Sequence, residues 1–200
     1  MNPNRRNLLA GCAVSALLPV RVFAAREPIL GGACEGCDWV YDGMPARPGS
    51  VARIAPAGEP GVPMTLEGVV TRGRVPAAGV IVYAYHTNRA GLYPVAANRH
   101  GSLRGWAKTD RDGRYRFDSI RPGAYPSRDI AEHVHMHIIE PGIGTYYIDN
   151  VEFLDDRLLD SSIPESLRGG SGRTMPVRHQ DAWQVRRHIE LGRNIPAYPR

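Results

Sequence analysis

Long apolar runs, helical periodicity and basic clusters are all scarce in this 200-residue sequence. Beyond residue 24, no stretch approaches the ~20 apolar residues that a membrane-spanning helix needs. No basic run interleaved with aromatic residues occurs, which argues against a nucleic-acid partner. No window of about 12 residues has a convincing 3.6-residue period, and no internal repeat is present. The sequence therefore predicts neither a helical bundle nor a repeat array.

Cysteine is scarce as well, with three residues in the whole chain. Cys34 and Cys37 form a Cys-x-x-Cys pair that lacks the strand–helix context usual for a redox motif of this spacing. A zinc site would need a further pair of ligands, and the sequence has no second Cys-x-x-Cys. In an oxidising compartment we therefore expect a disulfide between Cys34 and Cys37, with free or redox-active thiols as the alternative.

Residues 1–24 have the pattern of an export signal. Arg5-Arg6 precedes an apolar run from Leu8 to Val20, and small residues follow near position 24. The paired arginine favours the twin-arginine route, whereas a lipoprotein anchor at Cys12 is less favoured because the apolar run before it is too short. Removal of this segment would take three of the 25 basic residues and leave 22, against 20 acidic ones. We therefore expect an exported, periplasmic or extracellular protein with little net charge.

The rest of the chain divides into two parts. Residues 25–65 are rich in glycine and proline and predict an extended, irregular N-terminal arm that contains the Cys-x-x-Cys pair. Residues 66–200 contain short β-like runs separated by turn residues, which predict one all-β, Ig-like sandwich domain. The expected strands are 66–71, 80–85, 105–109, 114–117, 133–139 and 147–153, followed by a last strand through Trp183 and Leu191. One helical turn is expected near 164–167.

Three histidines alternate along one predicted strand, at His133, His135 and His137. Their side chains should leave the same face of that strand. Imidazole suits zinc, copper, iron and nickel, so the spacing alone does not select a metal or say which pair binds it. A polar row at the edge of a sandwich is the alternative interpretation.

Two tyrosines are further candidate ligands. Tyr93 lies on the loop after strand 80–85, and Tyr125 lies in a turn before the histidine strand. Tyrosinate is a hard oxygen donor with a precedent as an iron ligand. Each tyrosine taken alone is explained as well by packing or exposure, so the interpretation depends on the whole set. His86 and His100, near the Tyr93 loop, are expected to be exposed, with a role in the pocket as the alternative.

The order of these motifs resembles that of the intradiol ring-cleavage dioxygenases, in particular their exported, single-domain branch. The matching stretches are Gly91-Leu92-Tyr93, the hairpin 109–117, Pro122-Gly123-Ala124-Tyr125-Pro126 and His133-Val134-His135. The resemblance covers about residues 66–156 and implies the β-sandwich of that family. It also implies one non-haem Fe(III) per chain, held by Tyr93, Tyr125, His133 and His135. The implied reaction uses O₂ to cleave a catecholic ring between its two hydroxylated carbons, giving a muconate-type diacid.

The resemblance implies catalytic roles as well. Bound catecholate would displace Tyr125, which would help to take up a substrate proton. An arginine that stabilises negative charge in this family is replaced here by Ile130. Arg128 is close in sequence and is the expected substitute.

The substrate-binding positions depart from the family pattern. Asn150 stands where a glutamine is usual, and His137 falls on a position that is not a ligand; both are predicted near the substrate. Glu132 would place a carboxylate beside the strand that carries the predicted histidine ligands. These changes leave two alternatives open, a non-catalytic binding module and a zinc or copper site made of the three histidines. Edge strands and the arm would also allow a homodimer.

Overall fold

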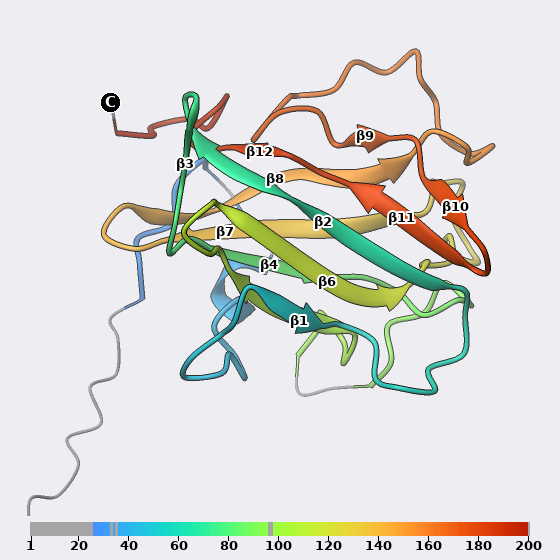
Figure 1. The fold of residues 1–200 in the computed structure, drawn as a ribbon. Coiled ribbons are helices and arrows are strands. Elements are labelled where there is room, and N and C mark those ends of the chain that lie inside the picture. The colour runs from blue at the N-terminus through green and yellow to red at the C-terminus, as the bar shows by residue number, and fades with distance from the viewer. Residues whose placement is uncertain (1–25, 33, 35, 96–97, 200) are drawn as a thin grey trace, which may run out of the picture.

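The computed structural model describes residues 26–32, 34, 36–95 and 98–199, and it arranges them as two stacked β-sheets (Figure 1). A short 3-10 helix, η1 (Cys37–Trp39), precedes the strands. The strands are β1 (Val51–Arg53), β2 (Pro63–Arg72), β3 (Val75–Pro76), β4 (Ile81–Tyr85), β5 (Arg104–Lys108), β6 (Arg114–Ile120), β7 (His133–Glu140), β8 (Gly144–Phe153), β9 (Arg173–Thr174), β10 (Val177–His179), β11 (Ala182–Arg186) and β12 (Ile189–Glu190).

The larger sheet has the order β1-β6-β2-β11-β10, and β3 and β12 also pair with β2. The smaller sheet has the order β5-β4-β7-β8-β9. In Figure 1 the larger sheet lies in front of the smaller one. Alternate residues such as Leu66, Phe117, Val82 and Met136 fill the space between the sheets and are fully buried. The predicted all-β sandwich is therefore confirmed.

The six strands predicted in the first part of the domain are all present, but two details of the prediction are wrong. The last predicted strand is divided into β11 and β12. Arg187 and His188 lie between them, and the Arg187 N–H still donates to the Glu67 carbonyl oxygen of β2 at 2.9 Å. The carbonyl oxygen of Arg187 accepts a hydrogen bond from the Tyr115 hydroxyl at 2.6 Å. The helical turn expected near 164–167 is absent, and Leu167 has a φ of 56°, which a right-handed helix does not allow.

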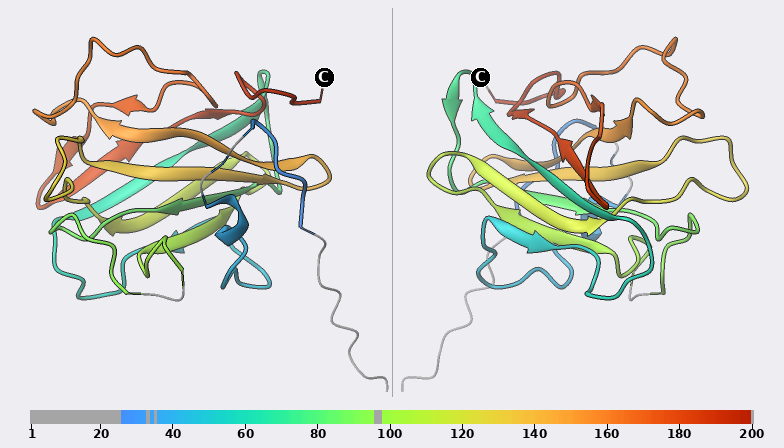
Figure 2. Two further views of the ribbon diagram at one scale, coloured as in Figure 1. Left: turned by 180° about the vertical axis from the view of Figure 1, so that it is seen from behind. Right: turned by 45° about the vertical axis from the view of Figure 1, so that its right-hand side comes forward.

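The segment expected as an N-terminal arm packs onto the sandwich. β1 pairs in parallel with β6, and Ile54 and Ala55 belong to the main core. Seen from behind, the chain around η1 lies over the smaller sheet (Figure 2). There Val40 forms a second apolar cluster with outward-facing residues of β4, including Tyr83. Both faces of β4 are therefore covered, and all five of its residues are buried.

The expected export signal and Cys12 lie outside the described residues. Within the part of the chain that the structure describes, no helix has the length and apolar character to cross a membrane.

Candidate metal centre

The histidines of the candidate site come from β7. Val134 and Met136 point into the main core and are fully buried, so the strand alternation turns His133 and His135 to the outer face of the smaller sheet. His135 pairs in register with Tyr85 of β4, and their rings stack at a centroid distance of 4.5 Å. The strand and its neighbour thus fix the direction of the imidazole.

The tyrosines reach the same place on two loops that touch. Gly91, with a φ of +75°, lies against the next loop so closely that a Cβ there would overlap the carbonyl oxygen of Ala124. A Cβ at Gly123 would likewise overlap the carbonyl oxygen of Arg89. Only glycine permits this approach. The glycines in the two tyrosine motifs therefore hold the two loops together.

Four donor atoms meet at this point. The hydroxyl oxygens of Tyr93 and Tyr125 are 2.6 Å apart. His135 Nε2 lies 2.9 Å from the Tyr93 oxygen and 3.1 Å from His133 Nε2. The Tyr125 oxygen is 3.4 Å from Nε2 of each histidine. The structure brings together the four residues predicted as ligands.

Both imidazoles are prepared to act as ligands. His133 Nδ1–H donates to the Ala131 carbonyl oxygen at 2.7 Å, which leaves the Nε2 lone pair directed at the other donors. Burial holds the pKa of His135 well below its usual value, and the neighbouring His133 lowers that pKa further. His135 is therefore neutral and has a free lone pair.

The donor set fits a ferric ion. Bonds of about 2.0–2.2 Å from a first-row metal to nitrogen and oxygen place neighbouring ligand atoms about 3 Å apart, close to the separations found here. Two phenolic oxygens give hard, anionic donors, and two imidazoles complete a set without sulfur. These four residues could hold iron with little rearrangement.

A β-bulge places Asn150 beside the site. Opposite His135, the register between β7 and β8 shifts so that Asp149 and Asn150 face a single residue. The Asn150 side chain is hydrogen-bonded to His135 and accepts a hydrogen bond from the Tyr147 hydroxyl at 2.9 Å. Burial raises the pKa of Tyr147 to about 12, so this hydroxyl stays protonated and donates. Substrate contact by Asn150 stays a prediction.

A cavity of about 880 Å³ opens over the four donors. The predicted residues Arg128 and Ile130 line it together with Asn150, and the Arg128 guanidinium lies 5.8 Å from the centre of the Tyr125 ring. Sequence reasoning missed Trp39 and two further lining residues from loops, Arg99 and Arg168, whereas a pocket role for His100 was the alternative that it left open. Loop residues carry no periodicity that would have found them.

Two predicted neighbours of the substrate lie elsewhere. His137 is not among the residues that line this cavity; it is buried, and its Nδ1 faces the sulfur atoms of Cys34 and Cys37, which form a disulfide. The three histidines thus do not converge on one point. The Glu132 carboxylate does not line the cavity and instead accepts a hydrogen bond from Arg121 Nε at 2.7 Å.

The expectation of exposed loop histidines is wrong. His86 and His100 are both buried, and burial lowers the pKa of each to about 4. His86 bonds to Thr87 O and to Ser119 Oγ at 2.7 and 2.6 Å, and His100 bonds to the Tyr83 hydroxyl at 2.8 Å. The β4–β5 connection folds inward at both positions; both ring nitrogens of His86 have partners, whereas His100 has one at Nδ1 and none at Nε2.

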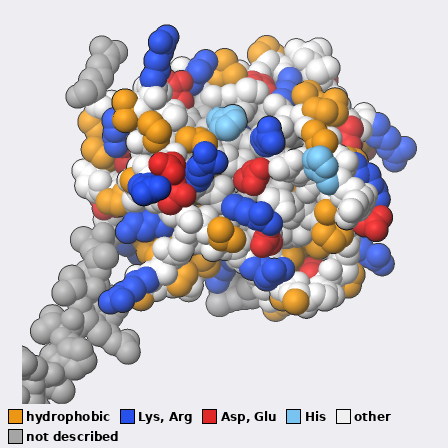
Figure 3. Space-filling view, in the orientation of Figure 1, with side chains coloured by type: hydrophobic (Ala, Val, Ile, Leu, Met, Phe, Trp, Pro, Cys, Tyr) orange, Lys and Arg blue, Asp and Glu red, His pale blue; other side chains and the backbone are white. Residues whose placement is uncertain are grey.

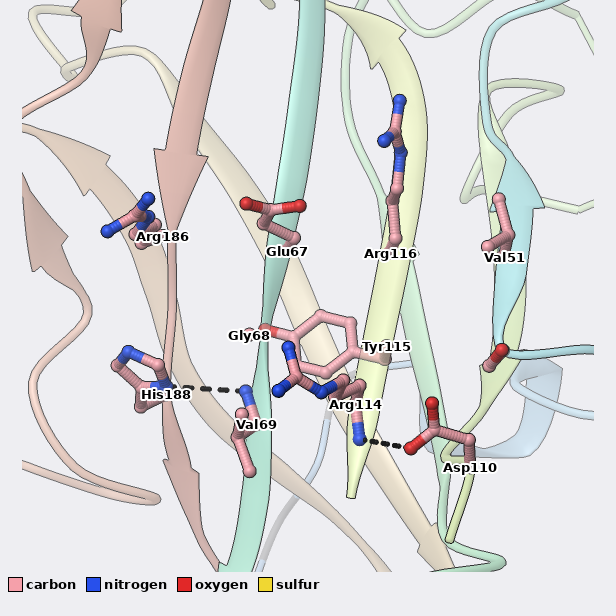
Figure 4. Close-up of a pocket in the computed structure, with 11 residues that line it drawn as sticks. Val51, Glu67, Gly68, Val69, Asp110, Arg114, Tyr115, Arg116, Arg186 and His188 are labelled. Carbon is pink, nitrogen blue, oxygen red and sulfur yellow. Dashed lines mark hydrogen bonds between the residues drawn. The ribbon is translucent and has the colours of Figure 1, made fainter. Parts of the chain in front are cut away.

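A second cavity, of about 390 Å³, lies on the outer face of the larger sheet. This face carries scattered cationic and acidic side chains (Figure 3), and the close-up in Figure 4 shows Arg114, Arg116, Arg186 and Glu67 on neighbouring strands. Arg116 pairs with Asp118, and Glu67 accepts a hydrogen bond from Gln184. Among the described residues, no group of three metal-ligating His, Cys, Asp or Glu side chains occurs there.

Comparison with known proteins identifies the family. A family model described as Dioxygenase matches residues 35–180. Catechol 1,2-dioxygenase 1 of Acinetobacter lwoffii is 34% identical over 134 residues, which are 59% of this chain and 41% of that protein. The protocatechuate 3,4-dioxygenase beta chain of Burkholderia cepacia is 30% identical over 111 residues, 46% of this chain and 47% of that one. The chain belongs to the intradiol dioxygenase family, as the motifs predicted.

The fold agrees with this assignment. The structure of hydroxyquinol 1,2-dioxygenase from Pseudomonas putida DLL-E4 matches with a TM-score of 0.57 at 20% identity, over 86% of this chain and 68% of that one. The chain spans less than half the length of the two curated relatives that it matches.

Proposed function

We propose that this protein is a non-haem Fe(III) dioxygenase that cleaves a catecholic ring between its two hydroxylated carbons to give a muconate-type diacid. The observation that carries the proposal is the convergence of four oxygen and nitrogen donors, each of which lies within 3.4 Å of at least two of the others. Tyr93, Tyr125, His133 and His135 would hold the ion. When bound, ferric iron makes the chelated catecholate reactive toward O₂.

Tyr125 has the position for the proton transfer that the reaction requires. It lines the cavity and lies on a loop, whereas the two histidines are fixed on a strand. A phenolic oxygen released by the incoming substrate can take up a hydroxyl proton from that substrate. Arg128, beside the Tyr125 ring, would stabilise the negative charge that develops nearby.

The charges around the cavity suit an anionic substrate. Among the described residues, Arg99, Arg128 and Arg168 line it, against one lining carboxylate, Glu152, which pairs with Arg173. A cavity with an excess of positive charge attracts anions and raises their local concentration. A catecholate, and more so a catechol that carries an acidic substituent, fits this environment.

The deciding experiment is the metal content and visible spectrum of the purified protein. Ferric iron bound by tyrosinate absorbs strongly in the visible range, so we expect about one iron per chain and a red to burgundy colour. Tyr93→Phe and Tyr125→Phe should lose or shift this absorption. Tyr198→Phe, whose hydroxyl bonds to Glu140 away from the four donors, should keep it.

The activity is tested next, with a panel of catechols and O₂ consumption. Ring cleavage with a muconate-type product, lost in His133→Ala, would support the proposal. A protein that stays colourless and metal-free after anaerobic loading with ferrous iron and reoxidation would refute it and favour a binding module.

We also propose that residues 1–24 direct export. Fractionation of cells that express the full chain should place it outside the cytoplasm, and replacing Arg5 and Arg6 with lysine should retain it inside.

A further inference from the structure

His137 has an environment that its neighbours on β7 do not share. It is 1% exposed, and its Nδ1 lies 3.8 Å from the sulfur of Cys34 and 3.7 Å from that of Cys37. Its Nε2 has no hydrogen-bond partner. A buried polar group without a good partner costs about 1–3 kcal/mol, so such a group in a native structure calls for an explanation.

We propose that Cys34, Cys37 and His137 form a second metal site, which binds zinc when the disulfide is reduced. Their three ligand atoms lie within 4.8 Å of one another, and among the described residues this is the one such group of three His, Cys, Asp or Glu side chains. The sequence interpretation discounted zinc for lack of a second cysteine pair. The fold supplies the missing ligand from β7, about 100 positions away along the chain.

The separations already suit zinc. Tetrahedral zinc, with bonds of about 2.3 Å to sulfur and 2.0–2.1 Å to nitrogen, places a sulfur and a nitrogen ligand about 3.6 Å apart. The two sulfur–nitrogen distances of 3.7 and 3.8 Å are close to this value. Zinc would require only that the two sulfurs separate to nearly 4 Å. The Cys-x-x-Cys spacing, turned at Gly36 with a φ of 84°, is typical of zinc-binding loops.

Reduction is the step that opens the site. A dithiol or phosphine reductant supplies two electrons and breaks the sulfur–sulfur bond, giving two thiols and the oxidised reductant. Zinc then binds both sulfurs as thiolates and releases two protons. Cys34 lines the large cavity and is only partly buried, so a small reductant can reach it.

His100 lies beside the cysteine turn but outside the group of three whose ligand atoms lie within 4.8 Å of one another, so its imidazole would have to move to take the fourth position. It is buried, its Nδ1 bonds to the Tyr83 hydroxyl, and its Nε2 has no partner. Its ring lies 5.9 Å from that of His137, and a Cβ at Gly36 would overlap its Nε2. The turn that carries the cysteines therefore rests directly on this imidazole.

The two sites should select different metals. The first has two phenolic oxygens and two imidazoles, which suit ferric iron, whereas the second has two soft thiolates and one imidazole, which suit zinc. A bound zinc would fix the cysteine turn against the smaller sheet, next to the wall of the large cavity.

The test compares oxidised and reduced forms of the full chain. The protein is treated with a phosphine reductant in the absence of oxygen, and the reductant is then removed. The reduced protein is titrated with zinc and, separately, with cobalt(II) as a spectroscopic probe. We expect one more zinc per chain in the reduced form than in the oxidised form, and thiolate-to-cobalt absorption only after reduction. Binding at the four-donor site occurs in both forms and cancels in the difference.

His137→Gln should weaken the reduction-dependent binding by at least the 10–100-fold that loss of even an outer partner of a metal ligand costs. His188→Gln changes an exposed histidine between β11 and β12; it is the matched control and should bind as the unaltered protein does. Circular dichroism checks that each variant folds; if His137→Gln does not fold, Cys34→Ser must abolish the extra zinc. The proposal is overturned if reduction adds no zinc, or if His137→Gln binds it as tightly as the unaltered protein.

Discussion

The carboxylate of Glu132 lies 2.7 Å from Nε of Arg121. Glu132 comes one position before His133, the first histidine of the candidate site. The other guanidinium nitrogens of Arg121 bond to both oxygens of Asp155, at 2.8 and 2.9 Å. The same guanidinium lies 4.7 Å from the centre of the Phe153 ring and 5.0 Å from that of Trp183. Phe153 belongs to the smaller sheet and Trp183 to the larger one. One arginine therefore joins the two sheets and keeps Glu132 away from the four donors.

Replacing Arg121 should destabilise the protein. In Arg121→Met, two partly buried carboxylates lose their counter-ion, so we expect the free energy of unfolding to fall by about 1–3 kcal/mol, less than for a fully buried pair. Urea denaturation measures this change. Arg116→Met, which breaks an exposed pair with Asp118, is the control and should cost under about 1 kcal/mol. Equal losses in both variants would contradict the bridging role of Arg121.

Alanine substitutions at Gly91 and Gly142 distinguish the cost of a positive φ from the loss of a contact between two loops. Both glycines have a φ of +75°, but a Cβ at Gly91 would overlap the Ala124 carbonyl oxygen, whereas a Cβ at Gly142 would meet nothing within 4 Å. Gly91→Ala should push the Tyr93 and Tyr125 loops apart and lose most of the bound iron. Gly142→Ala should show the cost of positive φ alone, about 1 kcal/mol of stability, with full iron content. Iron content per folded chain distinguishes the two effects, and equal iron in both variants would refute the docking role.

The strands were predictable because short-range alternation specifies them, and alternation along β7 placed His133 and His135 on one face. The alternation did not say which pair of histidines binds a metal, and the set of four donors came from the resemblance of the tyrosine and histidine motifs to those of the family. The position of His137 was not predictable in this way. It shares the face of the other two, but the chain segment around Cys37 covers it, and no local pattern says where that segment packs.

The division of the last predicted strand and the inward turn of His86 have a similar origin. Each depends on a distant partner, the Tyr115 hydroxyl for Arg187 and the Ser119 hydroxyl for His86. Such contacts join positions more than 30 residues apart, where periodicity carries no information.

Buried His86 should make stability fall in acid. Burial lowers its pKa from 6.5 to about 4, so below pH 6.5 the unfolded chain takes up this proton before the folded one does. The contribution of neutral His86 to the free energy of unfolding is complete above pH 6.5. It is lost as the pH falls towards 4, by up to roughly 3 kcal/mol. Denaturation at several pH values should show a shallower pH dependence in His86→Gln than in the unaltered protein. His179→Gln, on an exposed strand, should leave the dependence unchanged.

Asn150 should hold iron through His135 as well as lining the cavity. Asn150→Ala removes the hydrogen bond that orients this imidazole, and loss of such a partner costs about 10–100-fold in metal affinity. Tyr147→Phe removes only the 2.9 Å hydrogen bond to Asn150 and should weaken iron binding much less. The rate at which a chelator removes iron measures both variants. If Asn150→Ala kept its iron like the unaltered protein and only its KM for a catechol rose, Asn150 would be a substrate contact and not a support of the metal centre.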